Sequence, residues 1–148
     1  IEAKSQAKFD EASAYAKEVL SEKSTESIFF RSRKEFWKAL GQWDKVLDFY
    51  KELEANGEFD NGYKNHFSWQ VYKSCDDKKV IAQCLSWMKE VTTEEPNYVY
   101  LDTYAFLLSK SGIFTEAKRI AEKAIAAAKV EGESTKDLEK LLQKIEHQ

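Results

Sequence analysis

A short pattern of apolar and polar positions recurs along the chain and opens an apolar stripe each time. An aromatic or aliphatic residue is followed by two mostly polar residues and then by a small or short apolar residue. The last residues of the four copies are 34, 38 and 33 residues apart, and a period near 34 is typical of stacked helix pairs. The copies are Phe9-Asp10-Glu11-Ala12, Trp43-Asp44-Lys45-Val46, Ile81-Ala82-Gln83-Cys84 and Phe114-Thr115-Glu116-Ala117.

Helical spacing of apolar residues around these copies predicts about eight helices arranged as pairs. Glycines at Gly41, Gly57 and Gly112 mark expected turns, and Pro96 ends a pair because proline cannot donate a backbone hydrogen bond. The predicted organisation is a single helical domain over residues 1–148. It comprises a half repeat at 1–22, repeats at about 25–57, 60–96 and 97–131, and a capping helix at 134–147.

Polar residues before several helices are candidates for N-caps. Ser24-Thr25 precedes one helix, and Asp76 or Asp77 lies in a lengthened loop before another. Ser134, three residues before Asp137, predicts a variant of the capping box at the last helix. The apolar stripe of that helix, with polar residues elsewhere, is what a terminal cap requires, and it consists of Leu138, Leu141, Leu142 and Ile145.

Composition narrows the class of partner. The net charge of −3 and the absence of a long basic run argue against nucleic-acid binding. No apolar run approaches the ~18 residues of a membrane span, so membrane insertion is not expected.

Cys84 is expected as a buried free thiol, while a bridge to Cys75 stays open as the alternative. The chain opens with less than a full first repeat and without a Met, which predicts either a piece of a longer protein or a mature form whose front has been removed.

The segment Tyr98 to Glu131 resembles a tetratricopeptide repeat (TPR). Leu101, Tyr104, Ala105 and Leu108 match first-helix packing positions, Gly112 and Phe114 match the turn, and Ala117, Ala121 and Ala124 match the small second-helix positions. The resemblance extends over essentially the whole chain and implies a right-handed superhelical array of helix hairpins. Charged residues surround one small-residue position of the first full repeat, among them Arg33 and Lys34.

In TPR arrays the first helices line a concave groove that holds a peptide or protein. Large rings with polar neighbours are typical of binding hot spots, although Trp69 and Phe106 fit equally well as packing residues. The family's lysine-and-asparagine carboxylate clamp is not expected, because Glu35 stands where an asparagine would donate. The groove positions implied by the resemblance are Arg31, Glu35, Lys38, Asn65, Trp69, Tyr72, Asp102, Phe106 and Ser109.

A second resemblance covers the middle of the chain. The stretches Phe67 to Tyr72, Asp76 to Lys79, Ser86 to Lys89 and Pro96 to Ala105 are similar to the helical region behind a thioredoxin-like domain in exported proteins of Bacteroides-type bacteria. This resemblance implies an extracytoplasmic parent protein. No Cys-x-x-Cys pair is present, so no redox activity is implied for this region.

No catalytic, metal or cofactor site is expected. Only His66 and His147 are available, and neither lies in a cluster with metal-ligand spacing. The acidic pairs at Asp76-Asp77 and Glu94-Glu95 fit solvated caps better than acid–base groups. The prediction is therefore a non-catalytic scaffold that binds a protein or peptide. The alternative is a docking or spacer region for an upstream thioredoxin-like domain of the same chain.

Overall fold

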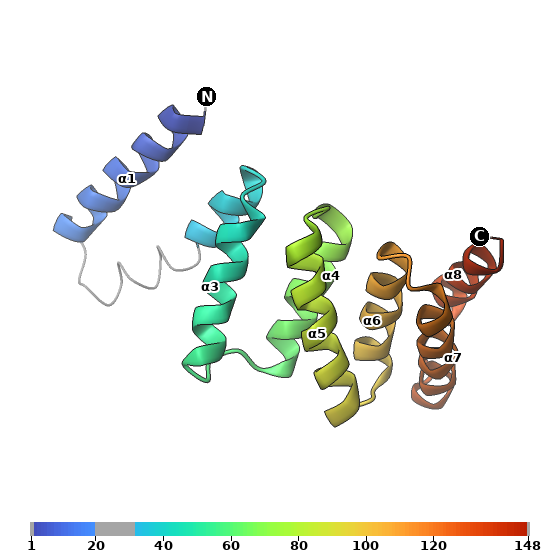
Figure 1. Ribbon diagram of the computed structural model, residues 1–148. Helices are drawn as coiled ribbons and strands as arrows, with labels where there is room; N and C mark the ends of the chain where they lie inside the picture. The colour runs from blue at the N-terminus through green and yellow to red at the C-terminus, as the bar shows by residue number, and fades with distance from the viewer. Residues whose placement is uncertain (1, 20–31, 148) are drawn as a thin grey trace. The chain divides into compact units, whose positions relative to one another are not determined.

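The computed structural model describes residues 2–19 and 32–147, and every regular element within these ranges is helical. The all-α class is therefore confirmed. Figure 1 shows the order of the helices along the chain, with a further helical segment at residues 32–39. The labelled helices are α1 (Glu2–Val19), α3 (Trp43–Ala55), α4 (Asn61–Ser74), α5 (Lys78–Glu94), α6 (Tyr98–Lys110), α7 (Phe114–Glu131) and α8 (Lys136–Glu146).

The chain divides into two compact units, at Ile1–Glu52 and Leu53–Gln148. In the first unit the ring of Phe9 stacks on that of Phe36 at 4.7 Å between centroids, so α1 packs against the segment 32–39. Ala12, the last residue of the first copy of the recurring pattern, is exposed to solvent. The equivalent residues Val46, Cys84 and Ala117 are fully buried. The expected cap at Ser24-Thr25 lies outside the described residues.

In the second unit consecutive helices pack on one another from α4 to α8. Besides these neighbours, α4 contacts α6 and α6 contacts α8, whereas no such contact joins α5 to α7. Helix α7 packs closely on α6 because it presents a row of buried small residues, and close approach of two helices needs small side chains at the contact. These residues are Ala117, Ala121, Ala124 and Ala128.

Aspartate and asparagine side chains fix where the helices of the second unit begin. An oxygen of Asp60 accepts a hydrogen bond from the Tyr63 backbone N–H at 2.9 Å, at the start of α4. Of the two candidates in the next loop, Asp77 is the cap of α5, because its carboxylate accepts from the Lys79 backbone N–H at 2.8 Å. Asn97 is the N-cap of α6, and its side chain accepts a hydrogen bond from the Tyr100 backbone N–H. Pro96 lies in the loop before α6, as expected.

The expected capping box of α8 does not form. Thr135 is the N-cap instead of Ser134, and it makes no side-chain capping bond. The helix begins one residue later than expected, so Asp137 occupies the second helical position, whereas a capping box needs its acidic residue at the third. The Thr135 hydroxyl donates to Glu139 Oε1 at 2.8 Å. The expected apolar stripe is correct in part, since Leu138 and Leu141 are buried.

Trp87 of α5 is the largest fully buried side chain among the described residues. Its ring meets Phe59 edge-to-face at 4.9 Å between centroids, and Phe67 at 6.2 Å. Its indole N–H donates to Glu54 Oε2 at 2.8 Å, which satisfies the one polar atom that the ring takes out of water. Glu54 is held in turn by Lys64 at 2.9 Å. The tryptophan therefore anchors α5 to residues that precede α4.

Gly112, in the turn between α6 and α7, has a φ of +76°. A methyl group there would meet no atom within 4 Å, so backbone conformation alone would oppose substitution. We expect Gly112→Ala to lower the free energy of unfolding by about 1–2 kcal/mol. Asparagine tolerates the left-handed region better, so Gly112→Asn serves as the control and should cost less. Urea denaturation of both variants tests this, and equal stability of Gly112→Ala and the parent would contradict it.

Candidate functional site

The predicted groove residues of the second unit lie on two neighbouring helices at helical spacing. Asn65, Trp69 and Tyr72 follow one face of α4, and Asp102, Phe106 and Ser109 follow one face of α6. Positions separated by four and then three residues share one face of a helix, and the two helices are packed together.

Three aromatic rings join the two stripes. The centroid of Trp69 lies 5.1 Å from that of Tyr72 and 5.7 Å from that of Phe106, and Tyr72 lies 5.2 Å from Phe106. We call these three residues the aromatic cluster. All three are partly accessible, while their neighbours Phe67, Val71 and Leu107 are fully buried. The cluster therefore packs between the helices and also presents ring surface to solvent, and a groove role for Trp69 and Phe106 stays a prediction.

A pocket of about 500 Å³ opens beside the aromatic cluster, where α4, α6 and α8 end. Its lining combines apolar side chains with three lysines. Of the residues that line this pocket, only Tyr72, Phe106 and Ser109 were among the groove positions predicted from the sequence. The complete lining is Tyr72, Lys73, Phe106, Ser109, Lys110, Phe114, Leu141, Lys144 and Ile145.

The contribution of α8 to this pocket was missed because its apolar stripe was interpreted only as a cap. Leu141 is buried against the array, but Ile145, one turn later, is partly accessible and lines the pocket. Lys73 and Lys110, in the last turns of α4 and α6, were missed for another reason. Lysines near helix ends are ordinary surface residues, and only the parallel course of these helices brings them to one opening.

The lysines at the pocket have different partners. The Lys110 ammonium donates to the Tyr72 backbone carbonyl at 2.9 Å and lies 3.1 Å from an oxygen of Asp76. The Lys73 ammonium lies 5.4 Å from the centroid of the Trp69 ring, within the range of a cation–π contact. Lys144 has no acidic partner among the residues that the structure describes. The opening is therefore electropositive, although the whole chain is acidic.

Asp102 lies at the other end of the α6 stripe. Burial raises the pKa of its carboxyl from 3.8 to about 6, and the nearby Asp137 carboxylate adds to the rise. No hydrogen bond or ion pair reaches the Asp102 carboxylate from any residue in 2–19 or 32–147. Burial, followed by the charge of Asp102, also raises the pKa of the Tyr72 hydroxyl. A partly desolvated carboxylate without a partner is unfavourable in the isolated chain.

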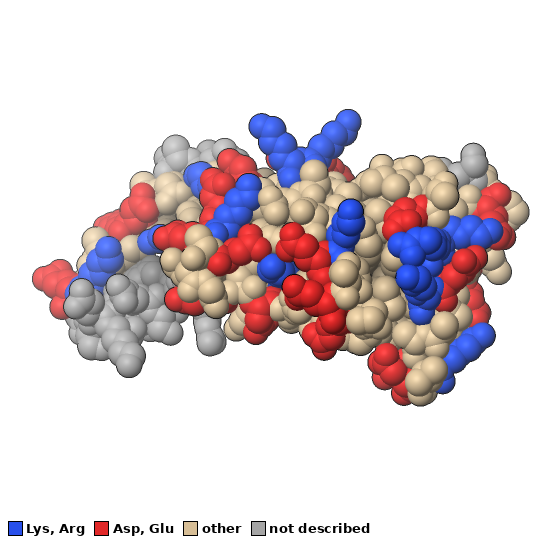
Figure 2. All heavy atoms as spheres, turned by 60° about the horizontal axis from the view of Figure 1, so that its bottom comes forward, with Lys and Arg blue, Asp and Glu red and all other residues tan. Residues whose placement is uncertain are grey.

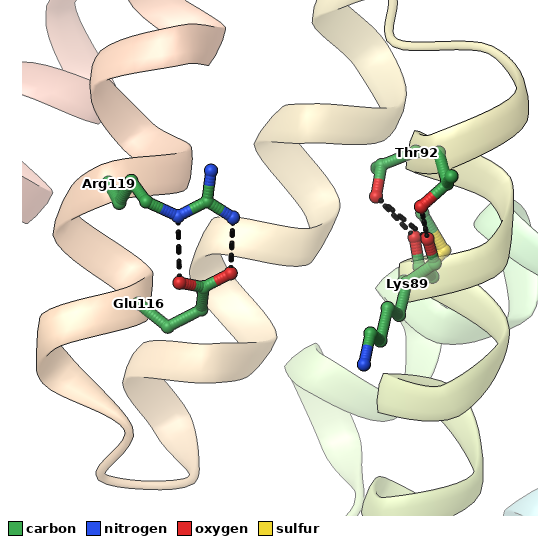
Figure 3. Close-up of polar contacts among 6 residues, drawn as sticks. Lys89, Thr92, Glu116 and Arg119 are labelled. Atoms are coloured by element: carbon green, nitrogen blue, oxygen red, sulfur yellow. Dashed lines mark hydrogen bonds and ion pairs between the residues drawn. The ribbon is translucent and has the colours of Figure 1, made fainter.

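Polar side chains on the other layer of helices satisfy one another locally. Figure 3 shows the guanidinium of Arg119 forked onto the carboxylate of Glu116, one turn earlier in α7. In α5 the hydroxyls of Thr92 and Thr93 donate to backbone carbonyls of Met88 and Lys89 at 2.7 Å. Figure 2 shows acidic and basic side chains interspersed over the face that it draws. Asp102 differs from these four side chains because its carboxylate is partly buried and has no partner among the described residues.

The remaining predicted groove residues belong to the first unit. Glu35 and Lys38 pair with each other, with Nζ and Oε1 2.8 Å apart. Arg31 lies outside the described residues. These three positions stay a prediction as part of the groove, and the site described here consists of residues from the second unit.

Neither cysteine nor histidine chemistry is assembled at this site. Cys75 and Cys84 are both buried free thiols, which confirms the favoured interpretation of Cys84, while Cys75 is buried at the end of α4. His66 is exposed and contacts Gln70, four residues later in α4. Within the described ranges no three His, Cys, Asp or Glu side chains are grouped so as to hold a metal ion. None of the described helices is long and apolar enough to cross a bilayer.

We expect both thiols to be unreactive in the folded protein at pH 8. Burial raises the pKa of Cys84 to about 12, which the Ser68 hydroxyl opposes only in part, and burial also raises the pKa of Cys75. Because the thiolate is the reactive form, a disulfide reagent should label neither residue until denaturant is added. The test is to count the cysteines that the reagent labels in native buffer and in denaturant. Rapid labelling of Cys84 in native buffer would contradict it.

We expect Asp102→Asn to stabilise the protein at neutral pH and to have little effect in acid. The folded state holds the Asp102 proton up to about pH 6, whereas the unfolded chain releases it near pH 4, so ionisation lowers stability as pH rises between these values. Allowing for partial solvent access, the variant should gain about 1–2 kcal/mol at pH 7. Parallel denaturation of parent and variant at pH 4 and pH 7 measures the difference. An equal gain at both pH values would contradict this cause.

No protein-family model matches the chain, and no curated protein or solved structure matches it either. The TPR resemblance and the thioredoxin-associated resemblance therefore stay predictions.

Proposed function

We propose that the chain is a non-catalytic scaffold, a TPR-like right-handed superhelical array that binds a protein or peptide segment on the face formed by α4, α6 and α8. The observation that carries the proposal is the aromatic cluster beside the 500 Å³ pocket. The helix pairs α4–α5 and α6–α7 lie within the ranges proposed for repeats, 60–96 and 97–131, which supports the proposal.

The packing of the second unit supports a curved array. Contacts link α4 to α6 and α6 to α8 in one layer, while α5 and α7 in the other layer do not touch. In a succession of hairpins, the layer whose helices are closer together lies on the inside of the curve. The α4, α6 and α8 layer would then be the concave one, which agrees with the pocket found between the ends of these helices.

The aromatic cluster suits a binding face because its rings are already held in place. Each ring packs on the other two, so little side-chain freedom is left to lose when a partner arrives. Complete burial of an aromatic side chain contributes about 1.5–3 kcal/mol. Covering the remaining ring surface of this cluster would contribute a part of that for each residue, which suits a moderate peptide affinity.

A domain of the same polypeptide is the second candidate occupant. The resemblance to the region behind thioredoxin-like domains favours it, and the same face would then serve as an intramolecular dock. Both occupants require the aromatic cluster, so the same substitutions test both.

We expect Phe106→Ala to weaken the binding of peptides that are selected on the parent protein from a displayed random library. Loss of one ring should lower affinity about tenfold, equivalent to 1.4 kcal/mol. Tyr63→Ala is the matched control, because Tyr63 is an aromatic residue of α4 with 55% of its surface exposed and it does not line the pocket.

Isothermal titration of one selected peptide against the parent and both variants measures the effect, and circular dichroism checks that each variant is folded. Equal affinities for the parent and a folded Phe106→Ala variant would show that selected peptides bind elsewhere. The proposal would then fail.

A further inference from the structure

The two ends of the face formed by α4, α6 and α8 carry opposite charge. Helices α4, α6 and α8 run in the same direction, since residues from the last turns of all three line one pocket. Lys73, Lys110 and Lys144 lie at this end, which we call the lysine end. Among the described residues the only acidic side chain paired with these lysines is Asp76, bound to Lys110, and Glu146 at the end of α8 pairs with Lys118 instead.

The opposite end, where α6 and α8 begin, is acidic. Four carboxylates there act together to raise the pKa of the Tyr98 hydroxyl, after the larger effect of burial. Glu131 accepts a hydrogen bond from the Tyr98 backbone N–H at 3.0 Å, and Lys140 lies 3.2 Å from an oxygen of Asp137. No cation pairs with Asp102 among the described residues. The four carboxylates are those of Asp102, Glu131, Glu133 and Asp137.

Between the two ends lies apolar surface. Phe106 is one turn after Asp102 on the α6 stripe, and the pocket beyond it is lined by Phe114, Leu141 and Ile145. A helix rises about 1.5 Å per residue, so Asp102 and Lys110 are separated by about 12 Å along α6. An extended peptide covers that distance in about four residues.

We propose that this face selects a bipolar peptide segment, in which a basic side chain meets Asp102, an apolar side chain enters the pocket and an acidic side chain meets Lys73 and Lys144. The inference rests on the proposed function and adds the chemistry and the orientation of the ligand. Charge complementarity supports it at both ends, since the carboxylate of Asp102 and the ammonium of Lys144 both lack a partner in the described chain.

The Asp102 carboxylate is the proposed partner of the basic side chain of the peptide. The carboxylate is partly desolvated and has no partner in the part of the chain that the structure describes, whereas the Thr92 hydroxyl of α5 and the Arg119 guanidinium of α7 are hydrogen-bonded within their own helices. A guanidinium or ammonium group from the partner would restore the interactions that burial removes from this carboxylate. At the other end Lys73 already lies over the Trp69 ring, so an arriving carboxylate meets a cation that is held beside the aromatic cluster.

The test uses synthetic peptides with blocked termini and the whole chain. One peptide has an arginine and a glutamate about four residues apart, with leucine and phenylalanine between them, and a second has the arginine and glutamate exchanged. A neutral peptide carries glutamine at both positions. Fluorescence polarisation at low salt measures binding of each peptide to the parent, and to the double variant Asp102→Asn with Lys144→Gln. The matched control is Glu122→Gln with Lys123→Gln, two exposed positions of α7 that do not line the pocket.

We expect one of the two charged peptides to bind about fivefold more tightly than the neutral peptide, because each partly exposed ion pair adds a modest attraction. This advantage should disappear in the Asp102 and Lys144 variant and persist in the α7 control. If the neutral peptide binds the parent as tightly as both charged peptides, charge selection is wrong, while a loss of neutral-peptide binding in Phe106→Ala would still uphold the proposed function. If none of the three peptides binds the parent, the proposal that this face selects a bipolar peptide is also wrong.

Discussion

The packing of four helices around α6 is the constraint on which the second unit depends. Helices α4, α5, α7 and α8 all contact α6, and six of its thirteen residues are buried. Those buried positions cover most of the circumference of the helix. The residues that escape include Asp102, Phe106 and Ser109, which fall on a single stripe between α4 and α8. The candidate site is therefore the part of α6 that the array leaves uncovered.

The same packing gives the site its polarity. Hairpin connections reverse the chain at each turn, so every second helix runs in the same direction and like ends come together. Basic residues in the last turns of α4 and α6 are favourable there because of the negative end of each helix dipole. The array brings those ends together with that of α8, which turns three locally favourable lysines into one electropositive opening.

Sequence periodicity correctly predicted that the second unit is all-α. Gly112 and Pro96 mark helix ends through their own backbone chemistry, and an aspartate of the Asp76-Asp77 pair does so through its side chain, all of which needs no tertiary information. The errors arose where tertiary packing determines which residues are buried and where a helix begins. Ala12 fits the recurring pattern yet is exposed, and the start of α8 differs by one residue, which is enough to undo a capping box. The helical stripe at Trp69 and Phe106 was predictable, whereas the lysines of the pocket became visible only when three helix ends were brought together.

Asp102 is the clearest sign that this surface is shaped by something other than stability. A partly buried carboxylate with a pKa near 6 and no cation beside it costs free energy at neutral pH, and an apolar or amide side chain would cost less. Some polar groups elsewhere are satisfied, as with the indole of Trp87 on Glu54 and the fork of Arg119 on Glu116, whereas the buried Oδ1 of Asn65 and Oε1 of Gln70 on α4 have no partner among the described residues. Departures from such local consistency concentrate at functional sites, where stability is given up for binding or catalysis. The position of Asp102 next to the aromatic cluster therefore supports the proposed binding face on α4, α6 and α8.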